Sequence, residues 1–227
     1  TALVGITGTA TVEIIPITNG GMADIVITKP QYQPVIEQVL VAPLDGSFIT
    51  IDSFEIDANG DNVIEFGETV NITVTLKNVG TETASNVEMI LSIDDTYISL
   101  TDEYESFGDI LADGFATQES AFTFTVGMDV PNEHGFELTA NITSNEDTWE
   151  NEINLIAFAP ILTFGSTSIS GDDNSNGQLD PGETADVSVI INNEGGATVN
   201  GVYAMLQTVS DLITINTNNV DVGTVTF

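Results

Sequence analysis

Residues 57–80 read DANGDNVIEFGETVNITVTLKNVG, a segment that passes from a turn-rich acidic half into a half of alternating apolar and polar residues. Over residues 70–76 the apolar members are Val, Ile, Val and Leu, and the residues between them are Asn and Thr. A period of two places the apolar side chains on one face of an extended strand, which is typical of half-buried antiparallel sheets. The segment therefore predicts an all-β fold. The same alternation recurs in residues 87–93, 122–126 and 136–142.

The segment has a second copy, because residues 172–195 read DDNSNGQLDPGETADVSVIINNEG, 115 positions further along the chain. The same offset of 115 pairs Leu91 with Leu206 and Gly108 with Gly223. One repeat of about 115 residues has the size of an immunoglobulin-like sandwich. The sequence therefore predicts tandem immunoglobulin-like antiparallel β-sandwiches.

The repeat divides the chain into three parts. Residues 46–160 form one complete module, and residues 161–227 match the N-terminal part of a second, without roughly its last three strands. Residues 1–45 match the C-terminal half of a sandwich, because the runs ATVEII, ADIVIT and VIEQVLVAP resemble AFTFTV, LTANIT and EINLIAFAP at the end of the complete module. The chain begins with Thr1 and has no signal-peptide pattern, so we expect a mature product or a fragment of something longer.

The composition is strongly acidic, with 35 Asp and Glu residues against two lysines and a formal net charge of −33. Such a surface repels phosphate backbones and anionic lipids, so nucleic acid and membrane surfaces are not expected as partners, whereas cations are attracted. The hydrophobic fraction of 41% excludes a disordered acidic tail. The chain has no cysteine, which excludes disulfides and thiolate metal sites, and no apolar run has the length required for membrane insertion.

The two acidic loops place oxygen-bearing residues at the spacing of an EF-hand-type calcium loop. Positions one, three, five, nine and twelve would offer side-chain oxygens, and position seven would offer its backbone carbonyl. Position eight is apolar in both loops and would anchor each loop to the core, and position six is Asn62 or Gly177, where the chain turns sharply. The predicted ligands are Asp57, Asn59, Asp61, Val63, Glu65 and Glu68 in the first loop, and Asp172, Asn174, Asn176, Gln178, Asp180 and Glu183 in the second.

Hard oxygen ligands without His or Cys favour Ca²⁺ over zinc or copper. The flanking sequences are strands, so we expect the loop without the helix pair that usually surrounds it. The alternative is a solvated Asx-rich turn. The occurrence of two copies in register argues against this alternative. Extracellular modules often bind calcium with dissociation constants of about 10⁻⁴–10⁻³ M, which favours occupancy outside cells rather than signalling inside them. We therefore expect a structural role for calcium.

Other candidate sites carry weaker signals. His134, the only histidine, lies in the turn-like run PNEHG and is expected at the surface rather than in a catalytic centre. No cysteine and no serine nucleophile motif accompany it, so we predict that the chain is not an enzyme. Trp149 alternates with Ile153 and Leu155, which indicates packing rather than sugar stacking. A non-repeated acidic cluster follows one strand and is expected to be a solvated face: Asp94, Asp95, Asp102, Glu103 and Glu105.

The motif DxNxxxxxxxGE, followed by TVNITVTLKNVGTETASNV, resembles the calcium-binding immunoglobulin-like modules found C-terminal to the catalytic domain in large secreted bacterial proteins. Residues 8–12, Ala23–Thr28 and Tyr32–Ile36 are similar to the strands that close the immunoglobulin-like domain of gingipain-like cysteine peptidases. The resemblance implies an extracellular or cell-surface multidomain parent, such as a peptidase or an adhesin. The catalytic Cys and His of those peptidases have no counterpart here, so the resemblance implies no catalysis.

Three functions are compatible with these observations. The first is a calcium-stabilised stalk or spacer in a secreted or cell-surface protein. The second is a self-assembling extracellular fibre subunit, in which the partial sandwiches of neighbouring copies complete each other by strand addition. The third is an adhesin or carbohydrate-binding module, although one Trp and four Tyr offer little for a sugar platform.

Overall fold

The computed structural model describes residues 8–11 and 21–227, and every regular element in these residues is a β-strand. All pairings between named strands are antiparallel. One isolated parallel bridge joins Glu65 to Phe158. The prediction of an all-β, antiparallel fold is confirmed. The alternating runs 70–76, 122–126 and 136–142 lie within strands, and the run 87–93 does so except for Ile93, which follows the end of its strand.

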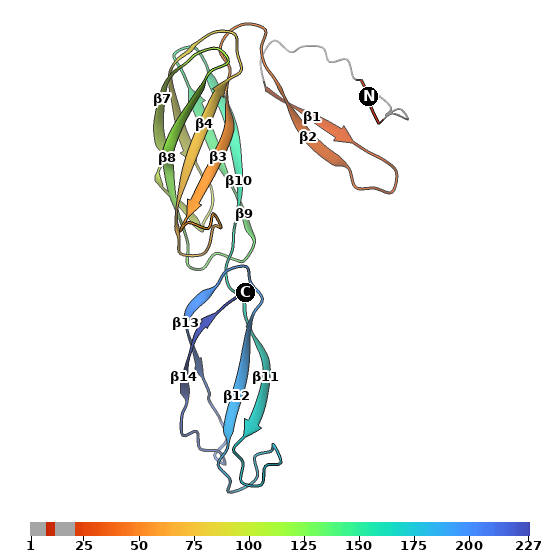
Figure 1. Ribbon diagram of the computed structural model, residues 1–227, viewed down its shortest axis with the longest axis vertical. Coiled ribbons are helices and arrows are strands. Elements are labelled where there is room, and N and C mark those ends of the chain that lie inside the picture. Colours follow the sequence, from red (N-terminus) through yellow and green to blue (C-terminus); the bar gives the residue numbers. More distant parts are fainter. Residues whose placement is uncertain (1–7, 12–20) are drawn as a thin grey trace.

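The middle of the chain is a two-layer sandwich whose inner faces form the hydrophobic core (Figure 1). One sheet has the strand order β3-β4-β8-β6, and the other has the order β10-β9-β5-β7. Ile72 and Val74 on β4 have no exposed surface, because the β10-β9-β5-β7 sheet covers their face. The strands are β3 (Ile49–Ala58), β4 (Thr69–Asn78), β5 (Ala84–Ser92), β6 (Ile98–Asp102), β7 (Tyr104–Ile110), β8 (Phe115–Val126), β9 (His134–Thr143) and β10 (Thr148–Ala157).

A buried asparagine, Asn78, joins several backbone segments at one corner of this sandwich, and we call this arrangement the asparagine corner. The Oδ1 atom of Asn78 accepts hydrogen bonds from the backbone N–H groups of Phe48 at 3.1 Å and Gly80 at 3.0 Å. Its Nδ2 atom donates to the carbonyl oxygens of Glu82 at 2.7 Å and Ile110 at 3.0 Å. One fully buried amide thus satisfies backbone groups from four places in the chain, which would otherwise be costly to bury.

Residues 162–225 repeat the first half of this sandwich with four strands in two separate pairs. β11 (Leu162–Ser170) pairs with β12 (Asp186–Asn193), and β13 (Val199–Met205) pairs with β14 (Asn219–Val225). The β13–β14 pairs equal the β5–β7 pairs plus 115 residues at every position, including both irregularities. The four strands therefore correspond to β3, β4, β5 and β7.

The asparagine corner is repeated as well. Asn193, at the position of Asn78, accepts hydrogen bonds from the N–H groups of Ile161 and Gly195, both at 3.0 Å. It donates to the carbonyl oxygens of Ala197 at 2.7 Å and Val225 at 3.4 Å. The local structure of the repeat is therefore reproduced even though only two strands form each sheet here.

The N-terminal part contains one hairpin, made of β1 (Gly21–Ile27) and β2 (Val35–Val41). Six of its large apolar side chains are exposed, namely Ile25, Val26, Ile27, Val35, Ile36 and Val39; Ile25, for example, retains 43% of its surface and Ile27 retains 51%. Figure 1 shows this hairpin beside one end of the central sandwich and β11–β14 beyond the other end. The expected strand ATVEII, residues 10–15, lies largely outside the described residues.

Candidate functional site

The first acidic loop, residues 57–68, connects β3 to β4, as predicted. Asn62 adopts a positive φ of 64°, as expected for the sharp turn at position six. Position eight anchors the loop, because the Ile64 side chain is buried in the core. The carboxylate of Glu68 accepts hydrogen bonds from the Asn59 side-chain amide and, at 3.0 Å, from the Glu65 N–H.

The second loop, residues 172–183, connects β11 to β12 in the same way. Gly177 has a φ of 73° at position six, and the Asp172 carboxylate accepts a 3.0 Å hydrogen bond from its N–H. The Oδ2 atom of Asp180 accepts hydrogen bonds from the amide groups of Asn174 at 2.9 Å and Asn176 at 3.0 Å. Positions three, five and nine therefore converge on one point in this loop.

Two contacts recur at equivalent positions in the loops. The position-five side chain accepts a hydrogen bond from the position-seven N–H, at 2.9 Å from Val63 to Asp61 and at 2.7 Å from Gln178 to Asn176. The position-twelve carboxylate accepts from the position-nine N–H, as it does at 3.1 Å from Asp180 to Glu183. The two loops are therefore similar in structure as well as in sequence.

The donor set of the loops consists of carboxylate and amide oxygens, which suits a hard cation. In the first loop positions three and twelve touch, and in the second loop positions three, five and nine do. Asp57 is exposed whereas its counterpart Asp172 is buried. Across the described ranges, no group of three or more Asp, Glu, His or Cys side chains is placed to hold a metal ion.

The loops differ in how firmly position eight is held. The prediction that both apolar residues anchor their loops is wrong for Leu179, which keeps 45% of its surface exposed. Ile64 is buried because the strand end at Phe158 lies beside it: the Phe158 N–H donates to the Ile64 carbonyl oxygen at 2.8 Å. The Phe66 N–H in turn donates to the Phe158 carbonyl oxygen at 2.9 Å.

Glu65, at position nine of the first loop, has a raised pKa. Burial contributes most, and the negative charges of Glu68 and Asp61 add to it. The backbone N–H of Thr198 acts in the opposite direction by donating to the carboxylate. Mutual repulsion of the loop carboxylates is a property that a bound cation would relieve. Thr198 belongs to the following repeat, so the first loop also lies at the junction between the two repeats.

The junction has a second polar contact, which sequence reasoning did not find. The Asn132 side-chain oxygen accepts hydrogen bonds from the N–H groups of Ala159 at 3.2 Å and Gly196 at 2.8 Å. Ala197, next to Gly196, is fully buried. A hydrogen bond between residues 64 positions apart has no signal in a single sequence. The asparagine corners were not predicted either, although the repeated motifs Asn78-Val79-Gly80 and Asn193-Glu194-Gly195 are a signal that could have indicated them.

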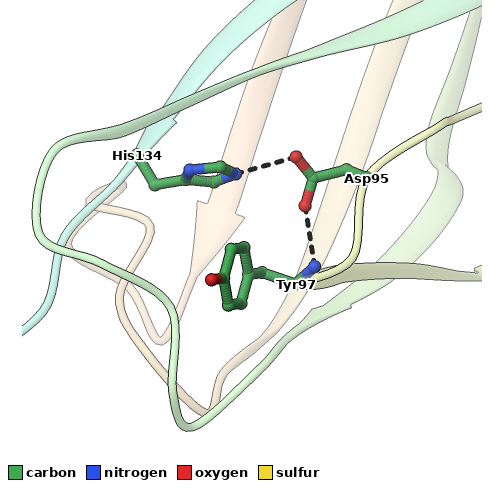
Figure 2. Close-up of polar contacts among 3 residues, drawn as sticks. All are labelled: Asp95, Tyr97 and His134. Atoms are coloured by element: carbon green, nitrogen blue, oxygen red, sulfur yellow. Dashed lines mark hydrogen bonds and ion pairs between the residues drawn. The ribbon is translucent and has the colours of Figure 1, made fainter.

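His134 forms the one histidine–carboxylate pair in the chain (Figure 2). Its Nε2 atom lies 2.8 Å from Oδ2 of Asp95, and its ring packs edge-on against Tyr97 with 5.0 Å between centroids. Burial alone would raise the pKa of Asp95, but the Tyr97 N–H and the His134 ring hold it below its ordinary value. His134 is half-buried at the start of β9 rather than in a surface turn, and its contacts indicate a structural role.

The open edges of the partial sandwich are the other candidate site. Within the described residues β12 pairs only with β11, and β13 pairs only with β14. Val187 and Val189, at the positions of Ile72 and Val74, retain 46% and 43% of their surface. An apolar face bordered by unpaired strand edges is a site for adding further strands. Trp149, in contrast, is buried against Phe48 in the complete sandwich and offers no sugar platform.

Comparison with known proteins gives only distant similarities. No family model and no curated protein match the chain. A crystal structure of BcpA, the major pilin subunit of Bacillus cereus, is 12% identical, with a TM-score of 0.27 over 88% of this chain and 81% of that one. A variant of the same subunit is also 12% identical, with a TM-score of 0.26 over 98% of this chain and 77% of that one. Scores this low do not establish a common fold.

No helix long and apolar enough to cross a membrane occurs in the part of the chain that the structure describes.

Proposed function

We propose that the chain is a non-catalytic structural subunit of an extracellular or cell-surface fibre, in which copies join by strand addition at open sheet edges. The observation that supports this is the exposure of core positions: Val189 retains 43% of its surface where Val74 retains none. Removing apolar surface from water contributes about 25 cal/mol per Å², so covering such a face favours association. A second copy has the complementary feature, the β1–β2 hairpin, which carries exposed apolar side chains.

The geometry of such an assembly follows from the positions of the two features. The hairpin and the β11–β14 region lie at opposite ends of the central sandwich (Figure 1). Contacts between one end of a copy and the other end of the next are heterologous, and they produce an open filament when the rotation does not close a ring. The central sandwich then spaces successive contacts.

Sedimentation velocity and negative-stain microscopy across the micromolar range test the proposal. We expect concentration-dependent growth into linear assemblies. A Val189→Asp variant places a charge on the open face and should remain monomeric. Ser188→Asp, at the exposed neighbouring position of β12 whose side chain points to the opposite face, is the matched charge control. A monodisperse monomer at every concentration would exclude the fibre.

We further propose that both acidic loops bind calcium and stiffen the subunit. The supporting observations are the repeated contacts at positions five, seven, nine and twelve, and the raised pKa of Glu65, which burial raises most and to which the charges of Glu68 and Asp61 add. Calcium that binds only the folded chain adds RT ln(1 + [Ca]/Kd), about 2.7 kcal/mol at a concentration a hundred times Kd. Because Glu65 also contacts Thr198, calcium would stabilise the junction as well as the loop.

Isothermal titration and thermal melting with calcium and with a chelator test this second proposal. We expect two sites per chain, of which one is lost in Glu68→Gln and the other in Glu183→Gln, since these substitutions remove the position-twelve carboxylates. Magnesium is the control cation, because it demands tighter octahedral geometry. An unchanged Tm and no heat at millimolar calcium would refute calcium binding and leave the fibre proposal standing.

A further inference from the structure

The N-terminal hairpin and the last two strands of the central sandwich share one pairing register. In the hairpin Ile27 lies opposite Val35 and Gly21 lies opposite Val41. In the β9–β10 pair Ile142 lies opposite Trp149, and Phe136 lies opposite Leu155. Every β1 position is therefore matched by a β9 position 115 residues later, and every β2 position by a β10 position 114 residues later.

The matched positions also share chemistry. The face of β9–β10 that points to the core carries Leu138, Ala140, Ile142 and Ile153, and all four are buried. The corresponding face of the hairpin carries Ala23, Ile25, Ile27 and Val39, the last three of which are large apolar side chains with substantial exposed surface. The one polar position in the middle of this face is Asn151 on β10 and Glu37 on β2. The hairpin is thus a β9–β10 equivalent whose apolar face is largely exposed and is covered by no other strand of the described residues.

The C-terminal region has the edge that such a hairpin would fill. In the central sandwich the sheet order is β10-β9-β5-β7, and β9 pairs with the edge of β5 that β7 leaves free. β13 and β14 reproduce β5 and β7 with the same register, yet β13 has no second neighbour among the strands of the described residues. Leu206, at the position of the buried Leu91, is 45% exposed and lines a surface hollow with Val209 and Ile215.

The charge distribution favours contact between these two regions. Residues 21–41 carry only Asp24, Lys29 and Glu37 as charged side chains, and residues 196–227 carry only Asp211 and Asp221. The net charge of −33 is therefore concentrated on the part of the chain between them. Since like charges across an interface oppose association, these two weakly charged ends are the surfaces on which two copies can approach most easily.

We infer that the β1–β2 hairpin of one copy adds to the free edge of β13 of the next, giving the sheet order β2-β1-β13-β14 in place of β10-β9-β5-β7. This rests on the proposed function and specifies its interface. The register follows from the β5–β9 pairs, in which Leu91 lies opposite Ala140 and Met89 lies opposite Ile142. Ile25 of one copy then lies opposite Leu206 of the next, and Ile27 lies opposite Ala204.

Disulfide trapping tests this register, because the natural chain has no cysteine. Single variants Ile25→Cys and Leu206→Cys are mixed under assembly conditions and oxidised with oxidised glutathione. Directly opposite residues have Cα atoms within the about 4.4–6.8 Å that a disulfide spans. The matched control pairs Ile25→Cys with Val202→Cys, which lies on the same face of β13 but about 13 Å further along the strand.

We expect roughly tenfold more disulfide-linked heterodimer from the in-register pair than from the control pair, because the control Cα atoms lie beyond disulfide reach. If the chain assembles but both pairs link equally or neither links, the register is wrong and the fibre proposal survives. If the unsubstituted chain does not assemble, both proposals fall. An Ile25→Asp, Ile27→Asp double variant provides an independent check: it should abolish assembly while the melting of the central sandwich is unchanged, and assembly at the unsubstituted level would overturn the inference.

Discussion

The central sandwich and the C-terminal four-strand region have the same local structure but differ in what covers it. Both contain the acidic loop, the asparagine corner and the β5–β7 type of pairing. In the central sandwich Val74 and Leu91 are buried, whereas Val189 and Leu206 retain 43% and 45% of their surface. The loop, the corner and the β5–β7 type of pairing therefore form within the first half of a repeat, and burial of the apolar face depends on further strands. The four comparisons below test how far this separation holds.

The asparagine corners should show the largest difference between the two regions. Asn78→Ala leaves the buried N–H groups of Phe48 and Gly80 without an acceptor, so it should lower the free energy of unfolding by about 3 kcal/mol. Asn193→Ala removes the same contacts from a half-exposed site where water replaces them, and about 1 kcal/mol is expected. Urea unfolding followed by circular dichroism measures both. Equal losses would mean that the two corners are equally buried in solution.

Matched valines on the core face should give the next largest difference. Val74→Ala empties a fully buried position and should cost about 2 kcal/mol, since two methyl groups and their packing are lost. Val189→Ala in a dilute, unassembled sample should change stability by less than about 0.5 kcal/mol. The same substitution should weaken assembly, which sedimentation detects. A large loss in dilute solution would show that the face is already covered within one chain.

These pairs also indicate what sequence alone reveals about this molecule. The period-two runs predicted the strands, and the positive φ at Asn62 and Gly177 was predicted from residue type at position six. The runs around Val74 and Val189 look alike, however, because alternation identifies an apolar face and not the strand that covers it. Leu179 was expected to be anchored like Ile64, but Ile64 owes its burial to backbone pairing with Phe158, almost a hundred residues away. Such non-local contacts leave no periodic signal.

Removing the negative charge at position nine should raise the Tm when it is done in the first loop but not when it is done in the second. The pKa of Glu65 is raised, so its protonation favours the folded chain, and this contribution is lost as the pH rises through the folded pKa. Glu65→Gln should therefore raise the Tm of the calcium-free chain at neutral pH by roughly 1–3 °C and flatten the decline of Tm as the pH rises above the ordinary Glu pKa of 4.5. Its counterpart is Asp180→Asn, which removes the charge from the group that accepts hydrogen bonds from Asn174 and Asn176 and should not stabilise the chain. Thermal melts from pH 4 to pH 7 with chelator present distinguish the two.

The Asp95–His134 pair should produce the smallest effect, and only in the central sandwich. The pKa of Asp95 is lowered by the Tyr97 N–H and His134 against the effect of burial. A lowered carboxyl pKa contributes stability above the unfolded value, which is lost as the pH falls through the folded value, so the loss lies below pH ~4. The position equivalent to Asp95 in the next repeat is Ser210, and no second histidine exists. Asp95→Asn should reduce the free energy of unfolding at pH 7 by about 0.5–1 kcal/mol, and the further loss of stability on acidification should be smaller than in the unsubstituted chain. His134→Gln, which keeps a hydrogen-bond donor near Asp95, is the control. If the stability of Asp95→Asn follows the same pH dependence as that of the unsubstituted chain down to pH 3, the acid sensitivity belongs to other carboxylates.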